Sequence, residues 1–97
     1  MQVAQTILEQ LGGNRFIAMT GARQIVAGPD FLQFGIGRGA REGINRVRVT
    51  LNCNDFYDVA FYKIRGVDVR EVALVENVDG LGLRHVFTEQ TGFDTRL

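Results

Sequence analysis

The chain has 97 residues, enough for one hydrophobic core but not for two. Its apolar fraction of 45% and charged fraction of 23% are those of ordinary globular domains, which argues against disorder. Eleven basic residues balance eleven acidic ones, so the overall charge predicts no non-specific attraction to nucleic acid or to anionic membranes.

The charges are unevenly distributed along the chain. Up to Arg48 there are six arginines against three acidic residues, whereas from Val49 onward there are five basic residues against eight acidic ones. This asymmetry is compatible with a polar partner or with head-to-tail self-association, and equally with no interaction at all.

The single cysteine, Cys53, excludes an intramolecular disulfide and a cysteine-rich zinc site, and it fits a cytoplasmic protein best. The first twenty residues contain Glu9 and no basic segment, so they do not resemble a secretion signal. No apolar run approaches the roughly 20 residues that a membrane-spanning helix needs.

The N-terminal segment has the periodicity of an amphipathic helix. Its apolar residues lie on one stripe, and Gly12-Gly13 follows and is expected to end the helix; the stripe comprises Val3, Ala4, Ile7, Leu8 and Leu11. Beyond it the alternation predicts strands at Arg15–Thr20 and Phe31–Ile36. The glycine-rich segment Gly37–Gly43 is expected to be an irregular, mobile loop.

The clearest pattern in the chain is a β-hairpin made by Ile44–Leu51 and Tyr57–Arg65, with the turn residues Asn52–Asp55 between them. Its predicted register places three apolar pairs toward the core, which are Leu51–Tyr57, Val49–Val59 and Val47–Phe61. The other face then carries Thr50–Asp58, Arg48–Ala60 and Arg46–Tyr62, with Ile44 and Ile64 as an apolar margin.

Val69–Val75 is apolar and β-branched enough for a fifth strand, with a short helix as the alternative. Asp79 is a candidate N-cap for a last helix that buries Leu83, Val86 and Phe87 and ends at Gly92. The sequence therefore predicts a single α+β domain over residues 1–97. We expect a two-layer sandwich in which an N-terminal and a C-terminal helix cover one face of an antiparallel meander of four or five strands.

Two features of this expected fold are candidate binding sites. The glycine-rich loop carries Arg38 and Arg41, which could order on a phosphate or on an acidic protein surface, although the Lys-Ser/Thr of a P-loop is missing. The uncovered face of the hairpin brings Arg46, Arg48 and Tyr62 together. Arginine beside an aromatic ring is typical of single-strand nucleic-acid binding, of a protein interface, or of a cross-strand pair that only stabilises the sheet.

Nothing in the sequence predicts catalysis or a cofactor. The only histidine, His85, lies beside the apolar stripe of the last helix with no second histidine or cysteine near it, so we expect a solvated side chain and no metal site. Cys53 has no neighbouring base to activate it. The carboxylates of Asp55, Asp58 and Glu71 look like solvated charges at turns and strand edges.

The segment Leu11–Ala22 (LGGNRFIAMTGA) resembles a stretch found in a group of small proteins of bacteriophages and integrated mobile elements. A second likeness lies in Val86–Gly92 (VFTEQTG). The resemblance implies a genomic setting in a bacterial host and supplies no catalytic residues.

The leading hypothesis from the sequence is therefore a non-enzymatic phage or mobile-element accessory protein. It would act in the cytoplasm of the bacterial host by surface binding to a host or phage protein, or to a second copy of itself. The alternative is a small nucleic-acid-binding module that uses Arg38, Arg41, Arg46, Arg48 and Tyr62. No membrane association is expected.

Overall fold

The computed structural model describes residues 2–93 and begins with two helices joined at a glycine kink. Helix α1 (Gln2–Leu11) buries Ala4, Ile7 and Leu11, as the apolar stripe predicts. Gly12 follows with a φ of 130°, a backbone conformation that favours glycine, so the helix ends where expected. The chain then turns and continues as helix α2 (Gly13–Thr20).

The prediction of a strand at Arg15–Thr20 is wrong, because this segment belongs to α2. Phe16 and Thr20, four residues apart, are both buried while Ala18 between them is exposed, which is helical rather than strand periodicity. The Thr20 hydroxyl donates to the Phe16 carbonyl oxygen at 2.7 Å. Gly21 ends α2 in the left-handed conformation, and its N–H donates to the carbonyl of Ile17.

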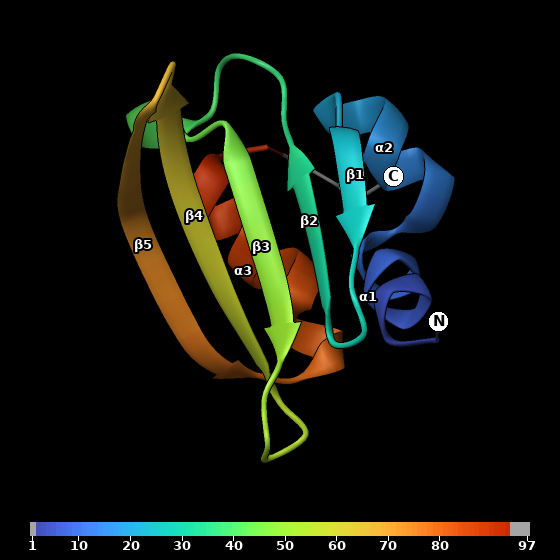
Figure 1. Cartoon of the computed structure of the whole chain (residues 1–97). Helices are drawn as coiled ribbons and strands as arrows, with labels where there is room; N and C mark the ends of the chain where they lie inside the picture. Colours follow the sequence, from blue (N-terminus) through green and yellow to red (C-terminus); the bar gives the residue numbers. More distant parts are fainter. Residues whose placement is uncertain (1, 94–97) are drawn as a thin grey trace.

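Five antiparallel strands follow, and each pairs with the next one along the chain, as a meander does (Figure 1). Their bounds are β1 (Arg23–Ala27), β2 (Phe31–Gly35), β3 (Arg46–Leu51), β4 (Tyr57–Arg65) and β5 (Asp68–Val78). The strand predicted at Phe31–Ile36 is confirmed, whereas β1 had no counterpart in the prediction. The fifth strand is confirmed and is longer than the predicted Val69–Val75. The alternative prediction of a short helix in this segment is wrong.

The predicted register of the β3–β4 hairpin is confirmed at every pair, from Arg46 opposite Tyr62 to Leu51 opposite Tyr57. Alternation buries one face of this hairpin, so Val47, Val49 and Phe61 are almost inaccessible to solvent. The alternating side chains of the hairpin, which include Arg46, Arg48 and Tyr62, lie on the opposite face of the sheet.

The C-terminal helix follows the predicted capping pattern with one difference. Asp79 accepts a hydrogen bond from the N–H of Gly82 at 2.8 Å, so it caps a short 3₁₀ turn, Gly80–Gly82, that leads into helix α3. Helix α3 (Leu83–Thr91) buries Leu83 and Phe87, and Gly92 ends it in the left-handed conformation.

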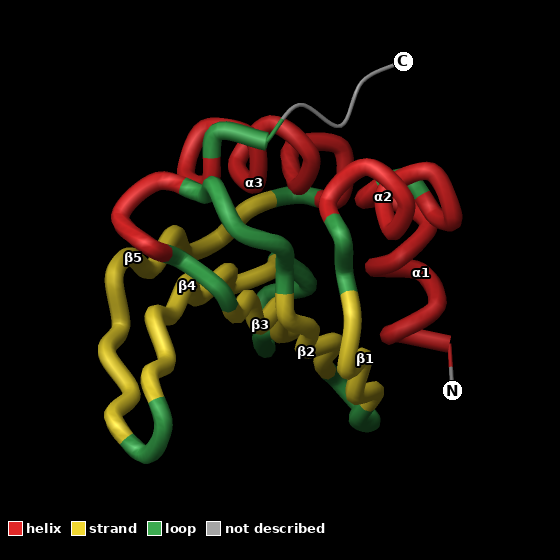
Figure 2. Tube along the Cα trace, turned by 90° about the horizontal axis from the view of Figure 1, so that it is seen from above, coloured by secondary structure: helices red, strands yellow, loops and turns green. Residues whose placement is uncertain are grey.

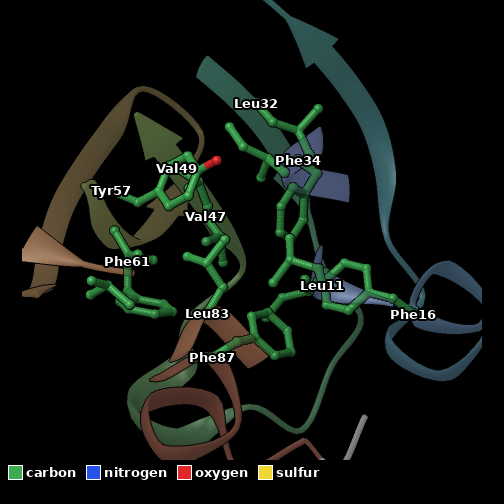
Figure 3. Packing of buried hydrophobic residues seen from close by; sticks show 14 of the residues in the cluster. Leu11, Phe16, Leu32, Phe34, Val47, Val49, Tyr57, Phe61, Leu83 and Phe87 are labelled. Carbon is green, nitrogen blue, oxygen red and sulfur yellow. The ribbon is translucent and has the colours of Figure 1, made fainter. Parts of the chain in front are cut away.

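The fold is an α+β arrangement in which the three helices lie on one side of the sheet (Figure 2). Between the layers, Phe16 from α2 packs edge-on against Phe34 of β2 and Phe87 of α3, with ring centroids 5.4 and 4.9 Å apart (Figure 3). Aromatic rings in this geometry attract through their quadrupoles as well as through burial. One aromatic cluster therefore joins both terminal regions to the sheet.

The side chain of Tyr57 is largely buried, and we therefore expect the protein to lose stability in alkali. Burial disfavours the phenolate, which raises the pKa of Tyr57 above its ordinary value of 10.0. The folded state therefore holds this proton more tightly than the unfolded state does, so this contribution is complete below about pH 10 and declines as the pH rises through the folded pKa. The variant Tyr57→Phe should lose less stability than the parent protein between about pH 9 and pH 11, as measured by thermal unfolding. Parallel pH curves for the two proteins would contradict this assignment.

Candidate binding surface

The side of the sheet away from the helices, hereafter the open face, is formed by the side chains that alternate with the core residues along each strand. The open face carries Val26 of β1, Phe31 and Gln33 of β2, Arg46, Arg48 and Thr50 of β3, Asp58, Ala60, Tyr62 and Ile64 of β4, and Val69, Glu71 and Leu74 of β5. The structure thus brings three of the predicted site residues, Arg46, Arg48 and Tyr62, to one surface.

Ile44 does not extend this surface, which corrects the predicted apolar margin. Its side chain is 2% exposed and belongs to the core. Strand β3 begins only at Arg46, and the N–H of Ile44 donates to the carbonyl of Arg41 at 3.0 Å as the preceding 3₁₀ turn closes. Strand alternation therefore does not reach back to position 44, whereas Ile64, on β4, does lie on the open face.

The open face has its own polar and aromatic contacts. The guanidinium carbon of Arg48 lies 4.1 Å from the centroid of the Phe31 ring, a cation–π arrangement. Arg46 stands opposite Tyr62 as predicted, and its Nη2 donates to Oε1 of Gln24 at 2.9 Å. The Nε of Arg46 is buried and makes no hydrogen bond within residues 2–93.

Apolar side chains flank these arginines on both edge strands. Val26 on β1 and Leu74 on β5 are each 49% exposed, and Val69 is more exposed still. Ala60, in contrast, is only 7% exposed although it belongs to the open face, because Arg48 and Leu74 stand on either side of it. The open face therefore combines exposed apolar side chains with arginine and tyrosine, two residue types that are enriched in protein interfaces.

The two loop arginines are separated from this surface and from one another. Arg41 donates from Nη1 to the carbonyl oxygen of Glu89 at 2.9 Å, close to the C-terminal end of α3, where a positive charge compensates the helix dipole. Arg38 is exposed and lines a cavity at the end of the sheet. The loop is irregular as expected, except that Arg41–Gly43 forms a 3₁₀ turn.

Charge is segregated along the strand direction, which the linear sequence only hints at. The basic end, where β1, β3 and β5 begin (top of Figure 1), carries Arg23, Arg38, Arg46, Lys63, Arg65 and Arg70. The opposite, acidic end carries Asp30, Asp55, Asp58, Glu76 and Asp79. No carboxylate within residues 2–93 forms an ion pair with any of the six basic side chains, although Glu42, Asp68 and Glu71 lie in the same part of the fold.

The basic end contains residues that the sequence analysis did not single out. Lys63 and Arg65 lie at the end of a correctly predicted strand, so their position was available as a signal. Arg23 gave no such signal because its strand was not recognised. Only the order of the strands in the sheet brings these three together.

The other candidate side chains lie where the sequence predicted. His85 is exposed and faces Glu89, with 3.4 Å between Nε2 and Oε2, and Cys53 is an exposed free thiol in the β3–β4 turn. No group of three metal-ligating side chains occurs within the described part of the chain, and no described helix is long and apolar enough to cross a membrane.

No protein-family model, curated protein or solved structure matches this chain.

Proposed function

We propose that this protein is a non-enzymatic accessory protein of a phage or mobile element that binds a protein partner through its open face. The observation that carries the proposal is the uncovered sheet surface on which Arg46, Arg48 and Tyr62 lie between exposed Val26 and Leu74. Arginine and tyrosine are enriched at protein interfaces, and they supply much of the binding energy where they are found. The genomic setting and the bacterial cytoplasm as location rest on the sequence resemblance.

The packing of Phe31 favours a protein over a single-stranded nucleic acid as the partner. Stacking of a base needs a free aromatic face. Arg48 covers one side of the ring, and the ring also packs so closely on Gly28 that a Cβ at that position would overlap it. Tyr62, which is half-buried, is the aromatic side chain left to stack on the open face.

A matched pair of double variants tests the proposal. Arg46→Ala with Tyr62→Ala should abolish stoichiometric capture of a partner from host lysate. Loss of this cross-strand pair costs only about 0.2–1 kcal/mol, so the fold should persist. Arg15→Ala with Phe56→Ala removes the same two kinds of side chain from exposed positions away from the open face and should leave capture unchanged.

Two further outcomes are decisive. Equal capture by both double variants would contradict the role of the open face. A dimer in light scattering that is lost in the Arg46/Tyr62 variant would identify the partner as a second copy of the chain.

A nucleic-acid-binding module is the second candidate, and the basic end of the sheet favours it. Fluorescence anisotropy with single- and double-stranded oligonucleotides tests it, because binding to phosphates weakens steeply with salt. Flat titrations at micromolar protein concentration would eliminate this candidate.

A further inference from the structure

A cavity lies at the basic end of the sheet and is lined in part by residues of the glycine-rich β2–β3 loop. Figure 1 shows this loop above the end of β2 and the start of β3. The volume of the cavity is about 330 Å³, at the lower limit of small-ligand pockets. Buried Ile36 and Ile44 line it together with four basic side chains, which are Arg23, Arg38, Lys63 and Arg65. The cavity thus has apolar walls and cationic groups from three different parts of the chain.

The electrostatics of this cavity favour an anion. No carboxylate lines it, and none within residues 2–93 is ion-paired with its four cations. A smaller cavity of about 150 Å³ adjoins it through Lys63 and Arg65 and adds Arg70, with Asp68 as the one acidic neighbour. Like charges held together in this way repel one another unless an anion or solvent compensates them.

The loop backbone supplies further donors. The N–H groups of Arg38 and Gly39 donate to no acceptor within the described part of the chain. Gly39 has a φ of 104°, a conformation that side chains other than glycine rarely adopt, and Gly37 and Gly39 present no side chain that would keep an anion from the backbone. Peptide N–H groups beside basic side chains are the usual donors to phosphate oxygens.

Gly43 leaves the space that the Lys63 side chain occupies at the cavity. A Cβ at position 43 would lie 3.1 Å from Cε and 3.3 Å from Nζ of Lys63, so the absence of a side chain there lets the lysine stem pass close to the loop. Lys63 and Arg38 therefore differ in solvent exposure. Lys63 is half-buried against the loop, whereas Arg38 is exposed.

We propose that this cavity is a phosphate-binding site that takes a small anion of diphosphate size or a terminal phosphate group. The volume, about eleven times the roughly 30 Å³ that a water molecule occupies in the liquid, accommodates a diphosphate with part of its hydration. Arg38, Lys63, Arg23 and Arg65 neutralise the charge, and the loop N–H groups of Arg38 and Gly39 donate to the oxygens. The proposal is independent of the open face, because Arg48 and Tyr62 do not line the cavity.

Titration of the full chain with inorganic pyrophosphate, followed by ¹H–¹⁵N NMR spectra, tests the site. We expect saturable shifts of the Arg38 and Gly39 amide signals. Lys63→Gln and Arg38→Gln keep an extended stem but remove the charge, and each should weaken binding by roughly tenfold, with a larger loss in the double variant. Arg15→Gln removes an exposed charge outside the cavity and should leave the affinity unchanged.

Oligonucleotides with and without a 5′-phosphate distinguish the source of the phosphate. Tighter binding of the phosphorylated oligonucleotide, with shifts of the same amides, would assign the site to a nucleic-acid end. Binding of pyrophosphate alone would assign it to a small molecule. Absence of saturable shifts with either probe, or equal weakening by Arg15→Gln and Lys63→Gln, would overturn the proposal, and the spectra of each variant report whether it is folded.

Discussion

Replacing Phe16 by alanine is expected to lower the free energy of unfolding by about 3–5 kcal/mol, the range for a fully buried phenylalanine. Its side chain is inaccessible to solvent and touches both Phe34 and Phe87. The variant loses apolar burial and two edge-on ring contacts, and it leaves a cavity between α2, β2 and α3. Since domains of this size are stable by about 5–15 kcal/mol, the variant should be marginal at ordinary temperatures.

Urea unfolding followed by circular dichroism measures the effect, and Phe56→Ala is the matched control. Phe56 lies in the β3–β4 turn and is 41% exposed, so its replacement should change the free energy of unfolding by less than about 0.5 kcal/mol. A loss below about 1 kcal/mol for Phe16→Ala would mean that α2 does not pack against the sheet as described.

The same segment shows where sequence reasoning failed. Six residues such as Arg15–Thr20 are too short for periodicity to separate a helix from a strand, because apolar side chains at neighbouring positions satisfy both patterns. A neglected signal was Gly21, which follows Thr20 and has the place and conformation of a helix C-cap. The tertiary environment decided the outcome, by burying Phe16 and Thr20 together.

Strand β1 was missed for a different reason. All five of its side chains are exposed, so Arg23–Ala27 has no buried set to produce alternation in the sequence. Its pairing with β2 shifts register between Arg23 and Val26, and Gln24 has a positive φ of 53°. An irregular edge strand of this kind is recognisable only from its partner.

The β3–β4 hairpin was predictable because two constraints agree on it. Apolar side chains alternate along β3 and along the first half of β4, where Tyr57, Val59 and Phe61 face the core, and the turn between the strands has residues that favour reversal. The register of the hairpin, and with it the set of residues that share the open face with Arg46, could therefore be predicted. The path of the Gly37–Gly43 loop has no such constraint, so the separation of Arg38 from Arg41 and the cavity at the basic end could not be foreseen.

Asn52 is expected to be the most important polar side chain of that hairpin. Asn52→Ala should cost about 2–4 kcal/mol if each of its four hydrogen bonds, which are largely exposed, contributes about 0.5–1 kcal/mol, the lower part of the usual range. Its Oδ1 accepts from the N–H groups of Asn54 and Phe56 at 2.9 and 3.2 Å. Its Nδ2 donates to Oδ1 of Asp58 at 3.0 Å and to Oδ1 of Asn77 at 2.9 Å. One side chain therefore closes the turn and ties it to the end of β5.

Two variants separate this role from a general effect of the turn, again by urea unfolding. Asn54→Ala alters the neighbouring exposed residue, whose side chain forms no hydrogen bond within residues 2–93, and should change stability by less than about 0.5 kcal/mol. Asn52→Asp keeps the acceptor but places a second carboxylate beside Asp58. It should therefore be least stable relative to the parent near neutral pH and recover as the pH falls below about 4, where protonation removes the repulsion. Equal stability of Asn52→Ala and Asn54→Ala would show that alternation of the strands alone, without this side-chain network, holds the hairpin in register.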